Sequence, residues 1–420
     1  MKNNNKFKIT INKKKIDNIK EKNKQNLDKG INILMEYKKF TKEKRKERVN
    51  SESTNKKNIL RLIIISIIII ITCILIYFFI QFAPILGIKL YNSNKDNINI
   101  QNVDYSNSII QKYNENLIIV EGKNIKTYNE KGKVIWEYNF EHTFKPEIYI
   151  KDEYMIICNK QNSTIYLFNN HKQILTKKID GKINDIYIDS YGNFIIEQNS
   201  SIYNKKILLY NKKGVLKEEI NMNSDIIIDI NILNNAKELV ILTANTQALR
   251  INSSIKYINL KNKEENIKEL YMLSDEIIIE HKIVNNELVI LTDKNLIMFS
   301  LETNNINKIQ SIDNSVIDNI KFNSNYYGLI TAENNEYYLK TYNYNLENII
   351  TNKIGRLPNN MKISKYIIAV ITDTKLTIYN KWGTLLKTID IKFEPMNIVI
   401  LNNSKTLALI YGKSIEFINL

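Results

Sequence analysis

The sequence predicts an all-β protein: an eight-bladed β-propeller on a single N-terminal transmembrane helix with a short basic cytoplasmic tail. Short β-branched and aromatic runs recur with a period near 40 residues, and no long amphipathic helix pattern follows Tyr91. An uncharged apolar segment of about 20 residues precedes them and follows a basic stretch. The expected boundaries are a tail over 1–58, the helix over 59–82, a linker over 83–96 and the propeller over 97–420.

The N-terminal tail carries most of the net charge. Residues 1–58 hold 19 Lys and Arg against 7 Asp and Glu, whereas the rest of the chain holds 41 against 37. The large domain is therefore close to neutral, which argues against a nucleic-acid-binding surface. A short amphipathic helix over 31–49 is predicted by apolar residues at helical spacing, Ile33, Leu34, Tyr37 and Phe40. Such a helix would bind the inner leaflet or a cytoplasmic partner; the simpler interpretation is a disordered tail that sets the topology.

The apolar segment has the length and composition of a membrane span. Leu62–Ile80 has no charged residue, and at 1.5 Å per residue it spans about 28 Å as a helix. The residues that flank it are Lys56, Lys57 and Arg61 on the N-terminal side, and Lys89, Lys95 and Asp96 on the other. Because positive charge remains on the cytoplasmic side, this asymmetry predicts a cytoplasmic N-terminus and a C-terminal domain outside the cell membrane.

One strand type recurs eight times after the linker. Its copies begin at Leu117, Tyr154, Phe194, Leu239, Leu288, Tyr327, Ile367 and Leu407. The strand after it often ends in an aromatic residue and asparagine, and a turn with glycine at a fixed offset follows at Gly132, Gly214 and Gly383. Further apolar runs before and after this pair make four strands per unit, which is a complete propeller blade. Eight units predict eight blades; seven blades, with one weak unit misread, is the alternative.

The two ends of the propeller are predicted to meet. The last unit lacks its outermost strand because the sequence stops at Leu420. Residues Asn97–Val103 form an alternating apolar run with no hairpin partner of their own. Pairing of this run along Ile415–Ile418 would close the ring and cover the open edge.

The sequence offers little for metal or disulfide chemistry. Cys73 lies in the apolar segment and Cys158 in the β domain, so no disulfide forms within the propeller. The three histidines, His142, His171 and His281, are not spaced as metal ligands. We therefore expect no cofactor, no metal site and no catalytic residue.

The turn Tyr128–Trp136 is similar to the repeat of quinoprotein-like and WD-like propellers, in which a glycine turn precedes an apolar residue and a tryptophan. The whole layout resembles an uncharacterised family of membrane-anchored propeller proteins from clostridia and related Gram-positive bacteria. The resemblance implies a fold and no established activity. Quinoprotein dehydrogenases hold their cofactor with a vicinal disulfide, and this sequence has no Cys-Cys pair.

Two sets of residues are candidates for contact with a ligand. Tyrosines crowd one blade, and Tyr326, Tyr337, Tyr338 and Tyr344 among them would grip a sugar or peptide if exposed. Packing between strands is the simpler interpretation. The acidic pairs Asp185/Asp189 and Asp225/Asp229 flank first-strand runs and would face the central channel, or else they are solvated charges at strand ends.

These observations favour a non-enzymatic, membrane-tethered binding or scaffolding module of the cell envelope. Its expected contacts are the cell membrane through residues 59–82 and an envelope protein or cell-wall ligand on the propeller. One alternative is a transmembrane sensor that relays ligand binding to a cytoplasmic partner of the tail. Another is a propeller lyase or hydrolase, which a cluster of three or more ionisable groups in the channel would favour.

Overall fold

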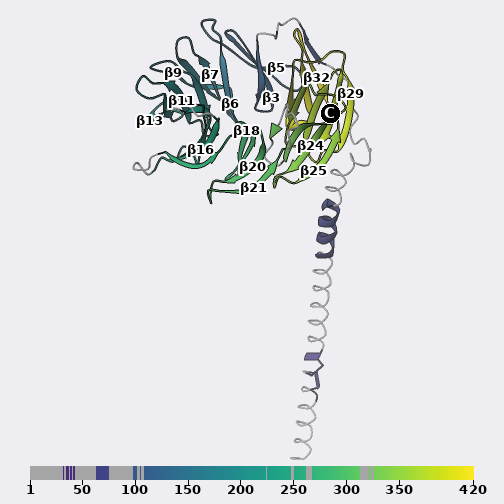
Figure 1. Cartoon of the computed structure of the whole chain (residues 1–420). Helices are drawn as coiled ribbons and strands as arrows, with labels where there is room; N and C mark the ends of the chain where they lie inside the picture. The colour runs from purple at the N-terminus through teal and green to yellow at the C-terminus, as the bar shows by residue number, and fades with distance from the viewer. Residues whose placement is uncertain are drawn as a thin grey trace, which may run out of the picture. The chain divides into compact units, whose positions relative to one another are not determined.

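The computed structural model describes residues 32, 35–36, 38–39, 41–42, 63–74, 98–101, 105, 108–223, 225–246, 250–261, 267–312, 321–322 and 326–420. The chain divides into two compact units, Met1–Leu86 and Gly87–Leu420. Figure 1 shows the strands of the second unit arranged as blades around a centre.

Residues 63–74 of the first unit are helical. The hydroxyl groups of Ser66 and Thr72 donate to the carbonyl oxygens of Ile63 and Ile69, each at 2.8 Å, so these two hydroxyl groups are satisfied within their own helix. The described part of the chain contains no helix with both the length and the apolarity of a membrane span. The predicted linker over 83–96 lies outside the described residues, as does most of the tail. Within the predicted helix over 31–49, the described residues 32, 35–36, 38–39 and 41–42 are helical.

The first four blades follow one another along the chain. The first consists of β2 (Ile109–Tyr113), β3 (Asn116–Glu121), β4 (Asn124–Tyr128) and β5 (Val134–Asn139). The second consists of β6 (Glu147–Lys151), β7 (Tyr154–Asn159), β8 (Thr164–Asn169) and β9 (Lys172–Lys178). The third consists of β10 (Asp185–Ile188), β11 (Phe194–Asn199), β12 (Lys205–Tyr210) and β13 (Leu216–Met222). The fourth consists of β14 (Ile226–Leu233), β15 (Glu238–Asn245), β16 (Asn252–Asn259) and β17 (Lys268–Leu273).

The last four blades complete the ring. The fifth consists of β18 (Ile278–Val284), β19 (Glu287–Thr292), β20 (Asn295–Ser300) and β21 (Asn305–Ser311). The sixth consists of β22 (Lys321–Phe322), β23 (Tyr326–Glu333), β24 (Glu336–Asn343) and β25 (Asn348–Lys353). The seventh consists of β26 (Asn360–Ile363), β27 (Ile367–Thr372), β28 (Lys375–Asn380) and β29 (Leu385–Asp390). The eighth consists of β30 (Asn397–Leu401), β31 (Thr406–Ile410), β32 (Ser414–Asn419) and β1 (Ile98–Gln101), with a short 3-10 turn at Asn402–Ser404.

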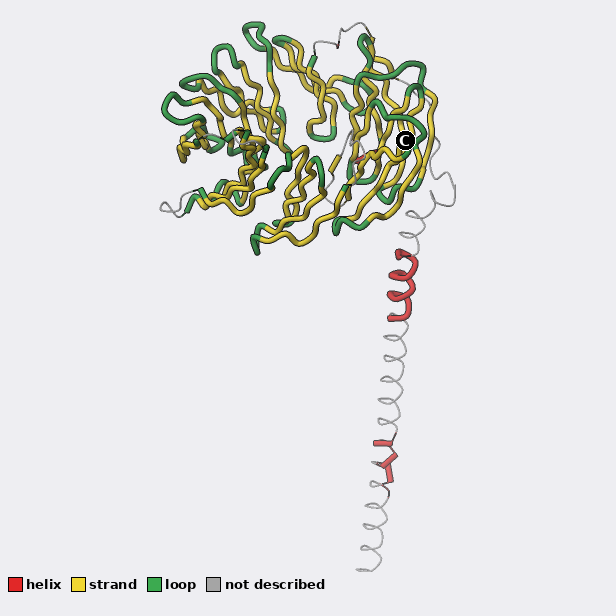
Figure 2. Tube along the Cα trace, viewed as in Figure 1, coloured by secondary structure: helices red, strands yellow, loops and turns green. Residues whose placement is uncertain are grey.

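The predicted count of eight blades is confirmed, and the seven-bladed alternative is wrong. All neighbouring strands within a blade are antiparallel, and Figure 2 shows them joined by short turns. The predicted closure is also confirmed. Strand β1 pairs antiparallel with β32, with Ile98 opposite Phe417 and Ile100 opposite Ile415. The last blade is therefore built from both ends of the propeller sequence, which leaves β32 with a partner on each side.

The hydrophobic core is divided among the spaces between blades. Eight clusters of buried residues each join two neighbouring blades. Successive side chains of one strand point to opposite sides, so Ile156 packs toward the third blade and Ile157 toward the first. This is why the second strand of every blade is a continuous apolar run. Cys158 is fully buried in the cluster between the second and third blades.

The repeated asparagine has a specific role in the turn between the third and fourth strands. Asn380 Oδ1 accepts hydrogen bonds from the backbone N–H groups of Trp382 (3.0 Å) and Thr384 (2.9 Å), and Gly383 N donates to Asn380 O. Asn129 and Asn211 make the same contacts in their own blades. The glycine adopts the positive φ that the turn requires, and the asparagine side chain accepts hydrogen bonds from the backbone N–H groups of the turn.

Candidate functional site

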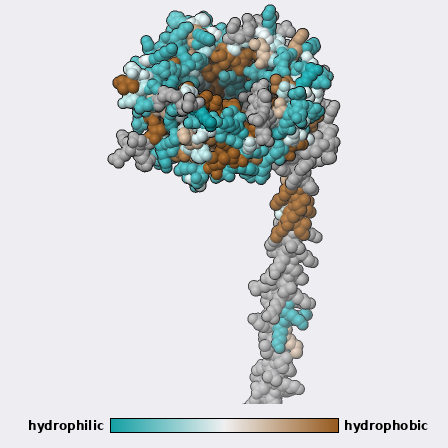
Figure 3. Space-filling view, viewed as in Figure 1, coloured by the Kyte–Doolittle hydropathy of each residue, from teal (hydrophilic) through white to brown (hydrophobic). Residues whose placement is uncertain are grey.

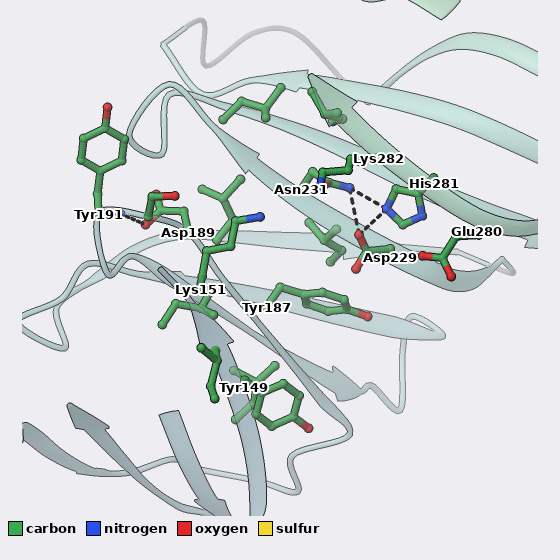
Figure 4. Close-up of a pocket in the computed structure, with 18 residues that line it drawn as sticks. Tyr149, Lys151, Tyr187, Asp189, Tyr191, Asp229, Asn231, Glu280, His281 and Lys282 are labelled. Atoms are coloured by element: carbon green, nitrogen blue, oxygen red, sulfur yellow. Dashed lines mark hydrogen bonds and ion pairs between the residues drawn. The ribbon is translucent and has the colours of Figure 1, made fainter. Parts of the chain in front are cut away.

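The first strands of four consecutive blades line a pocket of about 610 Å³ near the ring centre. First strands of neighbouring blades lie against one another around much of the ring, which makes them the innermost strands. Figure 3 shows that the visible face is hollowed at the centre of the ring. The side chains labelled in Figure 4 come from these strands and the turn after β10: Tyr149, Lys151, Tyr187, Asp189, Tyr191, Asp229, Asn231, Glu280, His281 and Lys282.

Two of the lining strands carry irregularities just before their polar residues. The pairing of β14 with β15 shifts register between Ile227 and Asp229, and that of β18 with β19 shifts between Ile278 and Glu280. A bulge inserts a residue and re-aims the side chains that follow it, and bulges are frequent beside functional sites. The polar side chains of these two blades therefore converge in the channel.

Asp229, Asn231 and His281 form a hydrogen-bonded group between the fourth and fifth blades (Figure 4). His281 Nε2 lies 2.7 Å from Asp229 Oδ2, and because the carboxylate accepts, Nε2 carries the donated proton. Asn231 Nδ2 donates to the same oxygen at 2.9 Å. A carboxylate-oriented imidazole of this kind can bind a polar ligand or transfer a proton.

Two of the three tyrosines that line the pocket, Tyr149 and Tyr187, are held by ion-paired glutamates. Tyr149 donates to Glu147 Oε2 at 2.7 Å and Tyr187 to Glu197 Oε2 at 3.0 Å. Each glutamate also pairs with a lysine, Lys160 for Glu147 and Lys205 for Glu197, both at 2.6 Å. Burial, reinforced by the adjacent carboxylates, raises the pKa of both Tyr149 and Tyr187, so both are neutral phenols at physiological pH. They contribute aromatic surface, and their hydroxyl protons are already donated.

Asp185 and Asp225 do not line the pocket. Asp225 is paired with Lys256, and both side chains are largely buried, at 11% and 15% exposure. Asp185 lies at the start of β10, where its Oδ1 accepts from Ile186 N at 2.8 Å. The other members of the two predicted pairs, Asp189 and Asp229, do line the pocket. Asp185 also interacts with Tyr149 of the second blade.

The predicted tyrosines lie away from the pocket as well. Tyr326 is a core residue, 2% exposed, and its hydroxyl donates to the carbonyl oxygens of Ser364 (2.7 Å) and Ile367 (3.0 Å) in the next blade. Tyr337, Tyr338 and Tyr344 are half-buried. Tyr338 donates to Glu336 of its own strand, and Tyr344 donates to Val284 O, which ties the sixth blade to the fifth. Packing therefore accounts for these tyrosines better than ligand contact.

Sequence reasoning named Asp189 and Asp229 but missed the basic residues of the pocket, Lys151, His281 and Lys282. The available signal was the run Glu280-His281-Lys282 inside β18, at a place where other first strands are mostly apolar. The described residues contain no group of three or more His, Cys, Asp or Glu side chains that could hold a metal ion. Ser190 is the one serine among the residues that line the pocket, and its hydroxyl group donates a hydrogen bond to Asp152 Oδ2.

Residues 88–420 match a family model described as "Family of unknown function (DUF5711)". The chain belongs to this family. No curated protein matches the sequence. The description of the family names no activity, so the chemistry of the pocket must be argued from its residues.

Solved structures resemble the fold at low sequence identity. The computationally designed Ika8 protein is 10% identical, with a TM-score of 0.52 over 74% of this chain and 95% of that chain. The C-terminal WD40 domain of Sif2 is also 10% identical, with a TM-score of 0.52 over 77% of this chain and 98% of that chain. BamB from Moraxella catarrhalis is 12% identical, with a TM-score of 0.48 over 77% and 98%. Similarity at this identity extends to the fold alone. The predicted likeness to clostridial and quinoprotein-like proteins stays a prediction.

Proposed function

We propose that the chain is a non-enzymatic binding or scaffolding module of the cell envelope, tethered to the cell membrane by residues 59–82. The observation that carries the proposal is the pocket, which takes side chains from four blades of a closed ring. A ring closed by strand pairing holds those side chains at fixed positions. Few side chains then have to become ordered when a partner binds, so binding loses little conformational entropy. The envelope protein or cell-wall ligand predicted from the sequence is the partner we expect there.

The membrane tether rests on the sequence. The uncharged segment Leu62–Ile80 and the basic residues before it support an anchor with the propeller outside the cell. Protease added to intact protoplasts should therefore degrade the propeller and leave a fragment that contains the tail and the anchor. Immunoblots against tags at the two ends would follow both parts. A propeller that survives until the membrane is permeabilised would contradict this orientation.

Crosslinking in the native membrane tests the binding function. We expect the full-length chain and a chain without residues 1–49 to capture the same envelope component, because the propeller carries the site. A double variant, Asn231→Ala with His281→Ala, should lose the capture, whereas His142→Ala, on an exposed loop, should keep it. Capture that depends on residues 1–49 would instead favour the sensor, which relays binding to a cytoplasmic partner.

An acid–base enzyme is the second candidate, and the pocket itself favours it. Asp229 and His281 are in contact, and Glu280 lines the same cavity, so ionisable groups of the kind that a lyase or hydrolase would use lie near one another. Release of soluble fragments from purified cell wall by the parent, but not by His281→Gln, would establish this activity in place of simple binding.

A further inference from the structure

We propose that Lys151 and Lys282 bind an anionic group of the pocket's ligand, a carboxylate or a phosphate. The proposal rests on the function proposed above, that the propeller is a binding module, and it names the chemistry of the ligand. The two lysines come from β6 and β18, on the second and fifth blades, yet they line the same cavity. Figure 4 shows both side chains extending into the pocket.

Neither lysine forms an ion pair or a hydrogen bond with another residue in the described part of the chain. Burial lowers the pKa of Lys282, and the charge of Lys151 lowers it further. Glu280 and Asp152 attract the ammonium group of Lys282 from a distance and partly offset the two effects that lower its pKa. Two cations that repel each other in a partly buried site favour an anion between them.

Two of the three acidic residues that line the pocket, Asp189 and Asp229, already accept hydrogen bonds from neighbouring donors. The carboxylate of Asp189 accepts from Tyr191 N, Asn193 N and Asn193 Nδ2, each at 2.8 Å. The carboxylate of Asp229 accepts from His281 and Asn231. Donors therefore satisfy these acceptors, whereas the lysine donors have no acceptor among the described residues. The hydrogen-bond donors of the two lysines are therefore suited to an anion.

The cavity is large enough for more than an inorganic ion. A volume of about 610 Å³ is within the range of small-molecule sites. The rings of Tyr149 and Tyr187 add a flat surface beside the polar groups, on which a sugar ring can lie. An acidic sugar or a sugar-like phosphate therefore fits both the size and the polarity of the pocket.

Matched pairs of probes test the proposal by isothermal titration calorimetry on the purified full-length chain in a neutral detergent. The probes are D-galacturonate with D-galactose, and glycerol 3-phosphate with glycerol. We expect at least one anion to bind and its neutral counterpart not to bind. Binding of galacturonate alone would assign a carboxylate, binding of glycerol 3-phosphate alone a phosphate, and binding of both a general oxyanion site.

Variants then locate the site. Lys282→Gln and Lys151→Gln should each weaken the binding about ten-fold or more, since each removes a charged hydrogen-bond donor. Lys282→Arg should retain most of it, and Lys178→Gln, on an exposed position of β9, should match the parent. Lys282→Gln should also unfold at the parent's temperature or above it, because burial and the charge of Lys151 disfavour the ammonium group of Lys282 in the folded chain. A drop in that temperature would indicate a structural lysine and overturn the proposal.

The proposal is also wrong if neither anion binds, or if the lysine variants bind as tightly as the parent. That result would leave the binding module intact, because crosslinked capture through Asn231 and His281 does not depend on an anion. Loss of capture together with normal anion binding would contradict the scaffolding function and leave the anion site in place.

Discussion

Deletion of Ile98–Gln101 is expected to destabilise the whole propeller and not only its last blade. The four residues form β1, the outer strand of the eighth blade, and their loss leaves β32 as an open edge. At about 1 kcal/mol for each hydrogen bond, with further loss of packing, the deletion should cost roughly 3–5 kcal/mol. The melting temperature should fall by roughly 5–10 °C, and the exposed edge should promote aggregation.

The effect should spread because the eighth blade shares its core with the first. Ile415 and Phe417 of β32 pack in one cluster with Leu117 and Ile119 of β3. A backbone hydrogen bond from Tyr105 N to Gly412 O, at 2.8 Å, also connects these two parts of the ring. Thermal unfolding of the full-length chain, followed by circular dichroism, would measure the change. Deletion of residues 92–95, which removes the same length of chain ahead of the strand, is the control. If both deletions melt like the parent, strand closure does not stabilise the ring.

Replacement of Gly383 by alanine is expected to have the second large effect. Gly383 has φ +81° in the turn before β29, and an added Cβ would overlap Ile350 Cγ2 and lie 2.7 Å from Thr341 Oγ1. The positive φ costs about 1–2 kcal/mol for a residue with a side chain. The overlap adds roughly 1–3 kcal/mol, because both contacted residues belong to the sixth blade and are fixed by its strands. We expect a total near 3–4 kcal/mol by urea denaturation.

Gly355→Ala is the matched control for this prediction. Gly355 also has a positive φ, +74°, but an added Cβ would meet no atom within 4 Å. It should therefore show the backbone cost alone, about 1–2 kcal/mol. The difference between the two variants measures how tightly the turn of the seventh blade packs on the sixth. Equal losses would mean that the turn moves away from its neighbour freely.

The sequence by itself determined the number of blades, the order of their strands and the way the ring closes. Each of these follows from local patterns: an apolar run for every second strand, an asparagine-to-glycine turn in several blades, and an alternating run near residue 100 with no partner of its own. Such patterns can be recognised in a sequence because successive side chains of a strand point to opposite faces and because a tight turn accepts few residue types.

Only the tertiary structure decided which residues meet in the channel. Lys151 and Lys282 are 131 positions apart, and nothing local to either shows that the ring brings them into one cavity. The bulges in β14 and β18 shift the alternation, so counting along the strand misplaces the side chains that follow. The contacts of Tyr326 and Asp225 also depend on the tertiary structure: a neighbouring blade buries Tyr326, and a lysine of the same blade pairs with Asp225. The side chain's surroundings in a propeller depend on strands far away in sequence, which a local pattern does not contain.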